Sequence, residues 1–167
     1  MDEIVNKVAQ SGLITIDLAE FKPLCLVELD IAPQLWQGIA LKETDFRDWV
    51  KSHDWSVYEG KNVCVFCSAD AIIPAWAFML VISSLTPFTQ MAIVGNRSDL
   101  EKQVIQTNIQ TLVKSDYIDK RIVIKGCSDI PHQQFALGVI TSWLQKEVKS
   151  IMFGEPCSTV PIYKRKK

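Results

Sequence analysis

The sequence predicts an α/β protein whose mostly parallel sheet is covered by helices on both faces. Three observations carry this prediction. Between residues 62 and 154, short apolar runs typical of strands alternate with longer helical patterns. The strand candidates are almost wholly apolar, as expected for strands buried on both sides. The chain has 167 residues, 48% of them hydrophobic, which suits one domain of ordinary size with a full core.

The part of the chain before this core is expected to form an N-terminal β extension. Residues 2–10 have the apolar spacing of a short helix. Residues 13–21 and 24–31 alternate as strands do, and they form either an antiparallel hairpin or two separate strands. A helix is expected at 44–52 with Thr44 as its N-cap, and a loop follows it.

The core is expected to follow the order β-α-β-α-β-α-β. Strands are predicted at 62–67, 90–95, 120–126 and 149–154, and helices at 70–85, 98–113 and 131–146. Ser98 and Glu101 have the spacing of a capping box. A common Rossmann-like sheet order for four such strands is 2-1-3-4. We therefore expect one domain over 1–167, made of the extension (1–60), the core (61–154) and an irregular tail (155–167).

A cysteine followed by a serine occurs three times, each time at or just after the end of a predicted core strand. These cysteines are Cys67, Cys127 and Cys157. In the order 2-1-3-4, the three strands that carry them are neighbours, about 4.8 Å apart. Because the carboxyl ends of parallel strands form the ligand crevice of an open sheet, we expect the three thiols to converge. No other internal repeat is evident.

Three converging thiolates favour a metal site that holds zinc or an iron–sulfur cluster. A closed zinc site needs a fourth ligand. The candidates for it are His53, Asp70 and Glu155, followed by Asp129 and His132. The side chains expected to surround the site, as helix caps or as hydrogen-bond donors to a thiolate, are Ser68, Ser128, Ser158 and Asp129. Cys25 and Cys64 are expected to lie in the core.

Two other classes of function stay open. The first is a cysteine-dependent enzyme or sulfur carrier, in which Cys127, close to a helix N-terminus, is the nucleophile. The second is a non-catalytic interaction protein, for which the aromatic residues and a homodimer matter and the thiols do not. Glycine-rich phosphate-binding motifs and a G-x-S-x-G motif are absent from the sequence, so nucleotide binding and α/β-hydrolase chemistry have no support.

Composition restricts the partners and the compartment. A net charge of −1 gives no electrostatic basis for binding nucleic acid. The longest apolar stretch, residues 71–82, is shorter than the roughly 20 residues of a membrane span, and the acidic start has no signal-peptide pattern. Five cysteines, an odd number, do not suggest a disulfide framework. We expect a cytoplasmic protein without nucleic-acid or membrane partners.

Several longer segments together resemble a known bacterial family, domain of unknown function 2480. These segments are EIVNKVAQSGLITIDL, HDWSVY, CSADAIIPAWAFML, RIVIKGCSD and KSIMFGEPCSTVPIYKRKK. The family has no established activity, so the resemblance implies little chemistry. Its members are often encoded near genes for SUF-type iron–sulfur assembly. The resemblance therefore implies an accessory role in iron–sulfur or sulfur metabolism, with iron–sulfur assembly proteins as partners.

Overall fold

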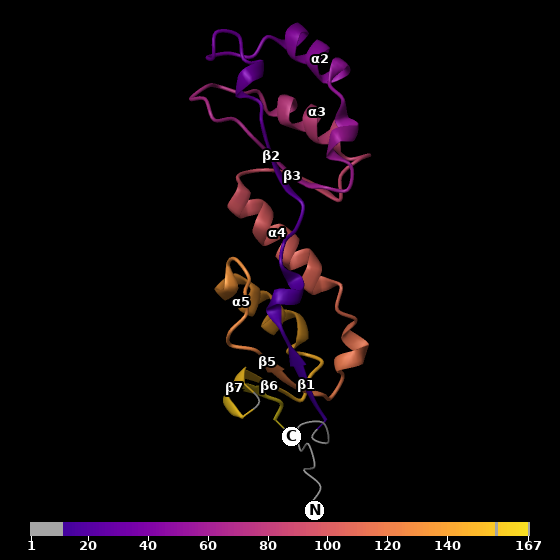
Figure 1. Ribbon diagram of the computed structural model, residues 1–167, viewed down its shortest axis with the longest axis vertical. Coiled ribbons are helices and arrows are strands. Elements are labelled where there is room, and N and C mark those ends of the chain that lie inside the picture. Colours follow the sequence, from indigo (N-terminus) through magenta and orange to yellow (C-terminus); the bar gives the residue numbers. More distant parts are fainter. Residues whose placement is uncertain (1–11, 156, 167) are drawn as a thin grey trace, which may run out of the picture. The chain divides into compact units, whose positions relative to one another are not determined.

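The chain folds into two compact units, each with its own sheet and core. Figure 1 shows the computed structural model, which describes residues 12–155 and 157–166. Unit 1 comprises Met1–Lys22 and Ile105–Lys167, and unit 2 comprises Pro23–Val104. Helices and mostly parallel strands make up both units, which confirms the predicted α/β class. The helix predicted at 2–10 lies outside the described residues.

Unit 2 is built on a sheet of three parallel strands in the order β2-β3-β4. Its elements are β2 (Leu26–Asp30), α2 (Glu43–Ser52), β3 (Asn62–Phe66), α3 (Ala75–Leu85), β4 (Met91–Val94) and the first half of α4 (Arg97–Gln110). Side chains of α2 and α3 cover one face of the sheet in a large apolar cluster. Leu100 and Val104 of α4 pack against Cys64 on the opposite face, so the central strand is buried on both sides.

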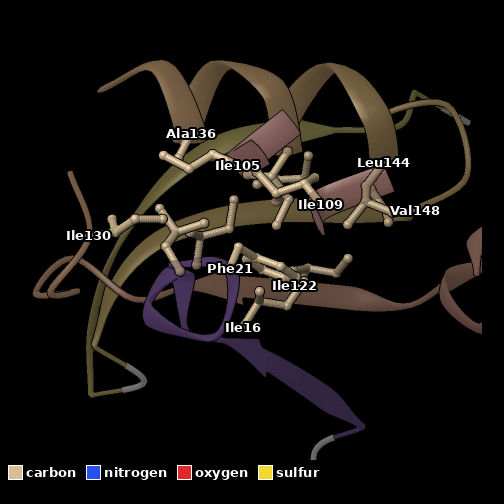
Figure 2. Packing of buried hydrophobic residues seen from close by; sticks show 13 residues of the cluster. Ile16, Phe21, Ile105, Ile109, Ile122, Ile130, Ala136, Leu144 and Val148 are labelled. Carbon is tan, nitrogen blue, oxygen red and sulfur yellow. The ribbon is translucent and has the colours of Figure 1, made fainter. Parts of the chain in front are cut away.

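Unit 1 is built on a four-stranded sheet in the order β1-β5-β6-β7, in which only β7 is antiparallel to its neighbour. Its elements are β1 (Leu13–Ile16), β5 (Arg121–Ile124), α5 (Gln133–Leu144), β6 (Ser150–Glu155) and β7 (Ser158–Lys164). Figure 2 shows its core, where Ala136 and Leu144 of α5 pack with Ile122 of the sheet. Ile105 and Ile109 add the second half of α4 to this cluster.

The described residues also form four short 3-10 helices, and two of them directly follow the first strand of a unit. They are η1 (Leu18–Phe21), η2 (Ala32–Gln34), η3 (Trp55–Tyr58) and η4 (Lys114–Tyr117). After β1, Asp17 caps η1 by accepting a hydrogen bond from the Ala19 amide. After β2, Asp30 accepts the equivalent bond from the Ala32 amide.

The two units repeat the same substructure. The segment β3-α3-β4 of unit 2 has a counterpart 59 residues later, in β5-α5-β6 of unit 1: Asn62 pairs with Met91 as Arg121 pairs with Ser150. The buried positions of the two helices follow the same shift, because Ala77, Val81 and Leu85 correspond to Ala136, Ile140 and Leu144. Each of these segments pairs with one strand from the N-terminal part of the chain, β2 or β1, in parallel.

The predicted sheet order 2-1-3-4 is wrong, because the four core strands belong to two sheets. The boundary between the units falls within α4, so β3 and β4 join β2, whereas β5 and β6 join β1. The alternation of strands and helices cannot reveal this, since a helix that leads to another sheet has the same apolar pattern as a crossover helix. The two N-terminal strands are separate strands and not a hairpin.

The irregular tail predicted for 155–167 is also wrong over most of its length. Residues 158–164 form β7, which pairs with β6 from Ser158 to Lys164. Pro161 lies within β7, although proline lacks a donor for the ladder. It is tolerated here because β7 is an edge strand and because the register shifts between Ile151 and Met152 beside it.

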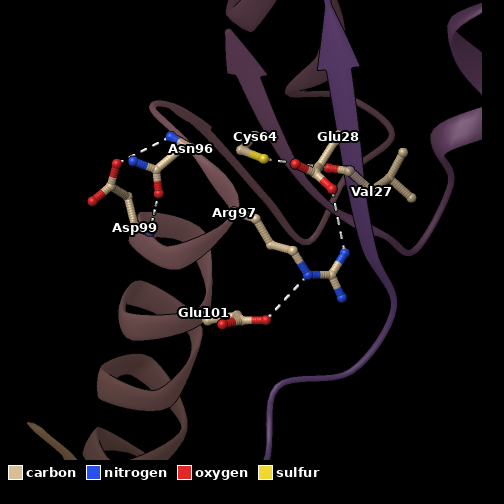
Figure 3. A network of polar contacts seen from close by, with 7 residues as sticks. All are labelled: Val27, Glu28, Cys64, Asn96, Arg97, Asp99 and Glu101. Carbon is tan, nitrogen blue, oxygen red and sulfur yellow. Dashed lines mark hydrogen bonds and ion pairs between the residues drawn. The ribbon is translucent and has the colours of Figure 1, made fainter. Parts of the chain in front are cut away.

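Two predicted helix caps are replaced by other residues. The helix predicted at 44–52 begins at Glu43, with Lys42 and not Thr44 at the N-cap position. Figure 3 shows the start of α4, where the Asn96 and Asp99 side chains accept bonds from each other's backbone amides at 3.1 and 3.0 Å. This pair forms the capping box in place of Ser98 and Glu101.

Candidate functional site: the Cys-Ser loops

The three Cys-Ser pairs are divided between the two units. Cys67 follows β3 in unit 2, whereas Cys127 follows β5 and Cys157 lies between β6 and β7 in unit 1. The strand that precedes Cys67 is therefore not a neighbour, within one sheet, of the strands that precede the other two cysteines. Cys127 and Cys157 do follow neighbouring strands, because β5 and β6 are adjacent and parallel.

The chain segments that lead to Cys127 and Cys157 touch each other at the carboxyl edge of the unit 1 sheet. A Cβ added to Gly126 would meet the Cα of Gly154 at 3.6 Å and the ring of Phe153 at 3.4 Å. Cys127 is the next residue after Gly126, and Cys157 follows Gly154 by three residues, a reach of roughly 10 Å at most. Both thiols are exposed. The edge therefore presents two accessible thiols on adjoining segments.

The loop that carries Cys127 is held in place on both sides of the cysteine. On one side, the carbonyl oxygen of Gly126 accepts a hydrogen bond from Nε2 of Gln133, at 2.8 Å. On the other side, the Ser128 hydroxyl donates to Oδ1 of Asp17 at 2.9 Å and accepts from the Leu18 amide at 3.2 Å. These bonds fix the backbone at Cys127 while its thiol stays exposed.

Asp17 is the most perturbed carboxyl group near this edge. It lies at the end of β1 and accepts hydrogen bonds from the Ala19 amide, from Nζ of Lys125 and from Ser128. These three bonds lower its pKa from 3.8 to about 2. The same contact raises the pKa of Lys125. Asp17 and Lys125 were not singled out in the sequence, although an aspartate stands at the carboxyl end of both β1 and β2.

The hydrogen bond between the serine of a Cys-Ser pair and an aspartate at the end of the neighbouring strand recurs in unit 2. Asp30, at the end of β2, accepts two bonds from Ser68: one from its hydroxyl at 2.5 Å and one from its amide at 3.0 Å. Burial raises the pKa of Asp30, but the bonds from Ser68 and Ala32 outweigh burial, so its pKa is lowered. The serines of the first two Cys-Ser pairs thus connect two parallel strands. Ser158 is exposed and pairs with Glu155 in the β6–β7 ladder.

Cys67 is less accessible than its counterparts in unit 1. It is half-buried, packs against the apolar cluster of unit 2, and its thiol donates to the carbonyl oxygen of Ala69 at 3.7 Å. Cys64 is fully buried within β3 as predicted, and burial raises the pKa of its thiol. Its thiol donates to the Val27 carbonyl (Figure 3). Cys25 was predicted in the core, but it is exposed; it lies just before β2 and has a positive φ of 55°.

The candidates for a fourth ligand are scattered. His53 lies in unit 2 within an aromatic cluster, 4.5 Å from the ring of Trp55, and its buried Nε2 has no hydrogen-bond partner among the described residues. Asp70 is an exposed residue of unit 2. In unit 1, Glu155 is exposed near Cys157, and Asp129 forms an ion pair with Lys22 at 2.6 Å. His132 is partly exposed before α5, at a φ of 52°.

Among the described residues, no group of three or more histidine, cysteine, aspartate or glutamate side chains is arranged to hold a metal ion. The part of the chain that the structure describes thus supplies at most a pair of thiols at the unit 1 edge. Two thiols are enough for partial metal coordination or for thiol chemistry, and a closed tetrahedral site needs further ligands.

A family model described as protein of unknown function (DUF2480) matches residues 2–165. The chain belongs to the DUF2480 family. No curated protein and no solved structure matches this DUF2480 protein. In the described part of the chain, none of the helices is both long enough and apolar enough to cross a membrane.

Proposed function

We propose that this DUF2480 protein binds a thiophilic metal, zinc or an iron–sulfur species, through Cys127 and Cys157 of unit 1. The observation that carries the proposal is the pair of exposed thiols on adjoining segments at the carboxyl edge of one sheet. Thiolates are soft ligands, and they select zinc, copper(I) and iron–sulfur clusters over harder cations.

The surroundings of the pair support a binding role. Because Ser128 and Gln133 fix the loop on either side of Cys127, that thiolate loses little freedom when it binds a metal. Glu155 adds an exposed carboxylate close to Cys157. The remaining ligands come from outside this pair. Cys67 was predicted as a third ligand. That it contributes to metal binding stays a proposal, which the variant Cys67→Ser tests.

The test is metal analysis of protein purified without air and without a metal-binding tag. We expect stoichiometric zinc, or iron with sulfide absorption, in the wild-type protein, and less than half of it after Cys127→Ser or Cys157→Ser. Cys25→Ser is the matched control, because Cys25 is also exposed but lies in unit 2. Equal metal content in all three variants would rule the proposal out. Cys67→Ser decides whether the Cys-Ser pair of unit 2 contributes.

A second candidate function is thiol chemistry, as a cysteine-dependent enzyme or sulfur carrier with Cys127 as nucleophile. The exposure of Cys127 on a loop held by Ser128 and Gln133 favours it. This function predicts that Cys127 of the metal-free protein is alkylated at least tenfold faster than Cys25, as followed by mass spectrometry. Equal alkylation rates for the two exposed thiols would argue against it. An accessory role in iron–sulfur metabolism fits either chemistry.

A further inference from the structure

In the part of the chain that the structure describes, no strand covers the β4 edge of unit 2, whereas a strand covers the equivalent edge of unit 1. Strand β4 corresponds to β6 in the repeat, and β6 pairs with β5 on one side and with the antiparallel β7 on the other. Among the described residues, β4 pairs with β3 only. All four of its residues are partly or largely exposed, whereas four of the five residues of β3 are buried.

An apolar groove runs beside this open edge. It has a volume of about 470 Å³, and it is lined by Ala75, Phe78, Met79, Ile82, Ala92, Ile93 and Val94. The equivalent groove of unit 1 is lined at matching positions by residues such as Leu137, Ile151 and Phe153, and β7 adds Ile162 to its wall. An apolar side chain from an antiparallel strand thus completes the groove in unit 1. In unit 2 that contribution is missing, and Met79 and Val94 are 71% and 53% exposed.

Apart from its short length of four residues, strand β4 lacks the features that normally keep edge strands apart. Its sequence, Met-Ala-Ile-Val, has no charge, no proline and no bulge. The opposite edge of the same sheet, β2, carries Glu28 and Asp30, and the outer strand of unit 1, β7, carries Pro161 and Lys164. An uncharged apolar edge is therefore a local feature of β4, and it is suited to pairing with another strand.

We propose that β4 pairs antiparallel with β4 of a second copy of this chain, about a two-fold axis. The unit 1 repeat indicates an antiparallel partner with apolar side chains, and β4 itself meets both requirements. Because β4 is uncharged, pairing with itself brings no like charges within the strands face to face. A two-fold pair of this kind is closed and leaves neither β4 edge open. This inference is independent of the metal proposal, because it involves no cysteine of the Cys-Ser pairs.

The test is sedimentation equilibrium of the full-length protein from about 1 to 100 µM, with Val94→Lys as the variant. We expect a wild-type dimer and a monomer of 18.9 kDa after Val94→Lys. Burying a lysine in place of an apolar valine at the paired edge should weaken self-association roughly 100-fold or more. Val160→Lys is the matched control, since Val160 is exposed to a similar degree on β7, and it should stay dimeric. A monomeric wild-type protein, or a Val94→Lys dimer, would overturn the proposal.

Hydrogen exchange provides a second readout that requires no variant. If β4 pairs with a second copy, its outward amides must exchange more slowly at high than at low protein concentration, while those of β7 must not change. Exchange in β4 that is independent of concentration would also overturn the proposal. Circular dichroism of Val94→Lys establishes that the variant is folded, which the exposure of Val94 leads us to expect.

Discussion

Replacing Gly154 by alanine tests whether the hairpin that carries Cys157 has the described geometry. Gly154 has a φ of +121°, in a region that is accessible almost only to glycine. A Cβ at this position would meet the carbonyl oxygen of Ser158 at 2.6 Å, which is closer than real Cβ atoms approach another atom. Because the obstructing atom belongs to the backbone, the β6–β7 turn must shift to accommodate the new methyl group.

The expected destabilisation follows from these two effects. A non-glycine residue held in this region of φ costs about 1–3 kcal/mol. Displacing the Glu155–Ser158 pair weakens backbone hydrogen bonds that contribute about 1 kcal/mol each. We therefore expect Gly154→Ala to lower the free energy of unfolding by about 3 kcal/mol. For a chain of this length, that corresponds to a fall in melting temperature of about 6–12 °C.

Thermal unfolding followed by circular dichroism measures this effect, with Gly138→Ala as the control. Gly138 lies inside α5, and nothing lies within 4 Å of a Cβ added there, so alanine should stabilise the helix by about 0.5–1 kcal/mol. The two glycine substitutions should thus change stability in opposite directions. A melting temperature for Gly154→Ala within 2 °C of the wild type would refute the geometry described for this turn.

Three further predictions concern the groups around the two sheets. The Asp17 carboxyl should titrate near pH 2 by NMR, and its stabilising effect, complete above about pH 4, should disappear as the pH falls towards 2. Asp17→Asn should remove that part of the acid sensitivity, and titration near 3.8 would show that the bonds to Asp17 do not form. Cys64 should resist alkylation until the protein unfolds, because it is fully buried, so rapid labelling of native protein would contradict its placement. Trp55→Phe should cost about 1–3 kcal/mol by urea unfolding, since it leaves the buried Val50 carbonyl without its 2.8 Å donor, and an unchanged midpoint would argue against that bond.

The positions of the four core strands could be predicted from the sequence, whereas β7 and the way in which the strands associate could not. The apolar runs at 62–67, 90–95, 120–126 and 149–154 all form strands, because short apolar runs bounded by turn residues favour strands. The choice of neighbour depends on contacts distant in sequence. Residues 13–16 and 26–30 each join a different core strand, and local alternation carries no information about that choice.

The structural repeat was hidden in the sequence for a related reason. The matching residues of α3 and α5 share burial more than identity: Val81 and Ile140 are both buried, and Met79 and Gly138 are both exposed. The recurring Cys-Ser pair was the part of this repeat that could be recognised in the sequence. In the structure, Ser68 and Ser128 perform the same task, since each hydroxyl bonds to the aspartate that ends the neighbouring strand. The motif thus has a structural role in both units, in addition to any role of its thiols.

The candidate site could be predicted only in part. The expectation that thiols gather at a sheet edge fits Cys127 and Cys157, because β5 and β6 are consecutive strands of one sheet. For Cys67, this expectation depended on the predicted sheet order, which is wrong. The candidates for a fourth ligand were chosen from sequence proximity and residue type, which cannot foresee that His53 packs among aromatic rings.

X-ray absorption at the metal edge tests the proposed site most directly. For tag-free protein prepared without air, we predict a shell with at least two sulfur ligands at about 2.3 Å, as in zinc–thiolate sites, and one sulfur fewer after Cys157→Ser. A shell of nitrogen and oxygen only, or a protein that contains no metal, would contradict the claim that Cys127 and Cys157 form a metal site.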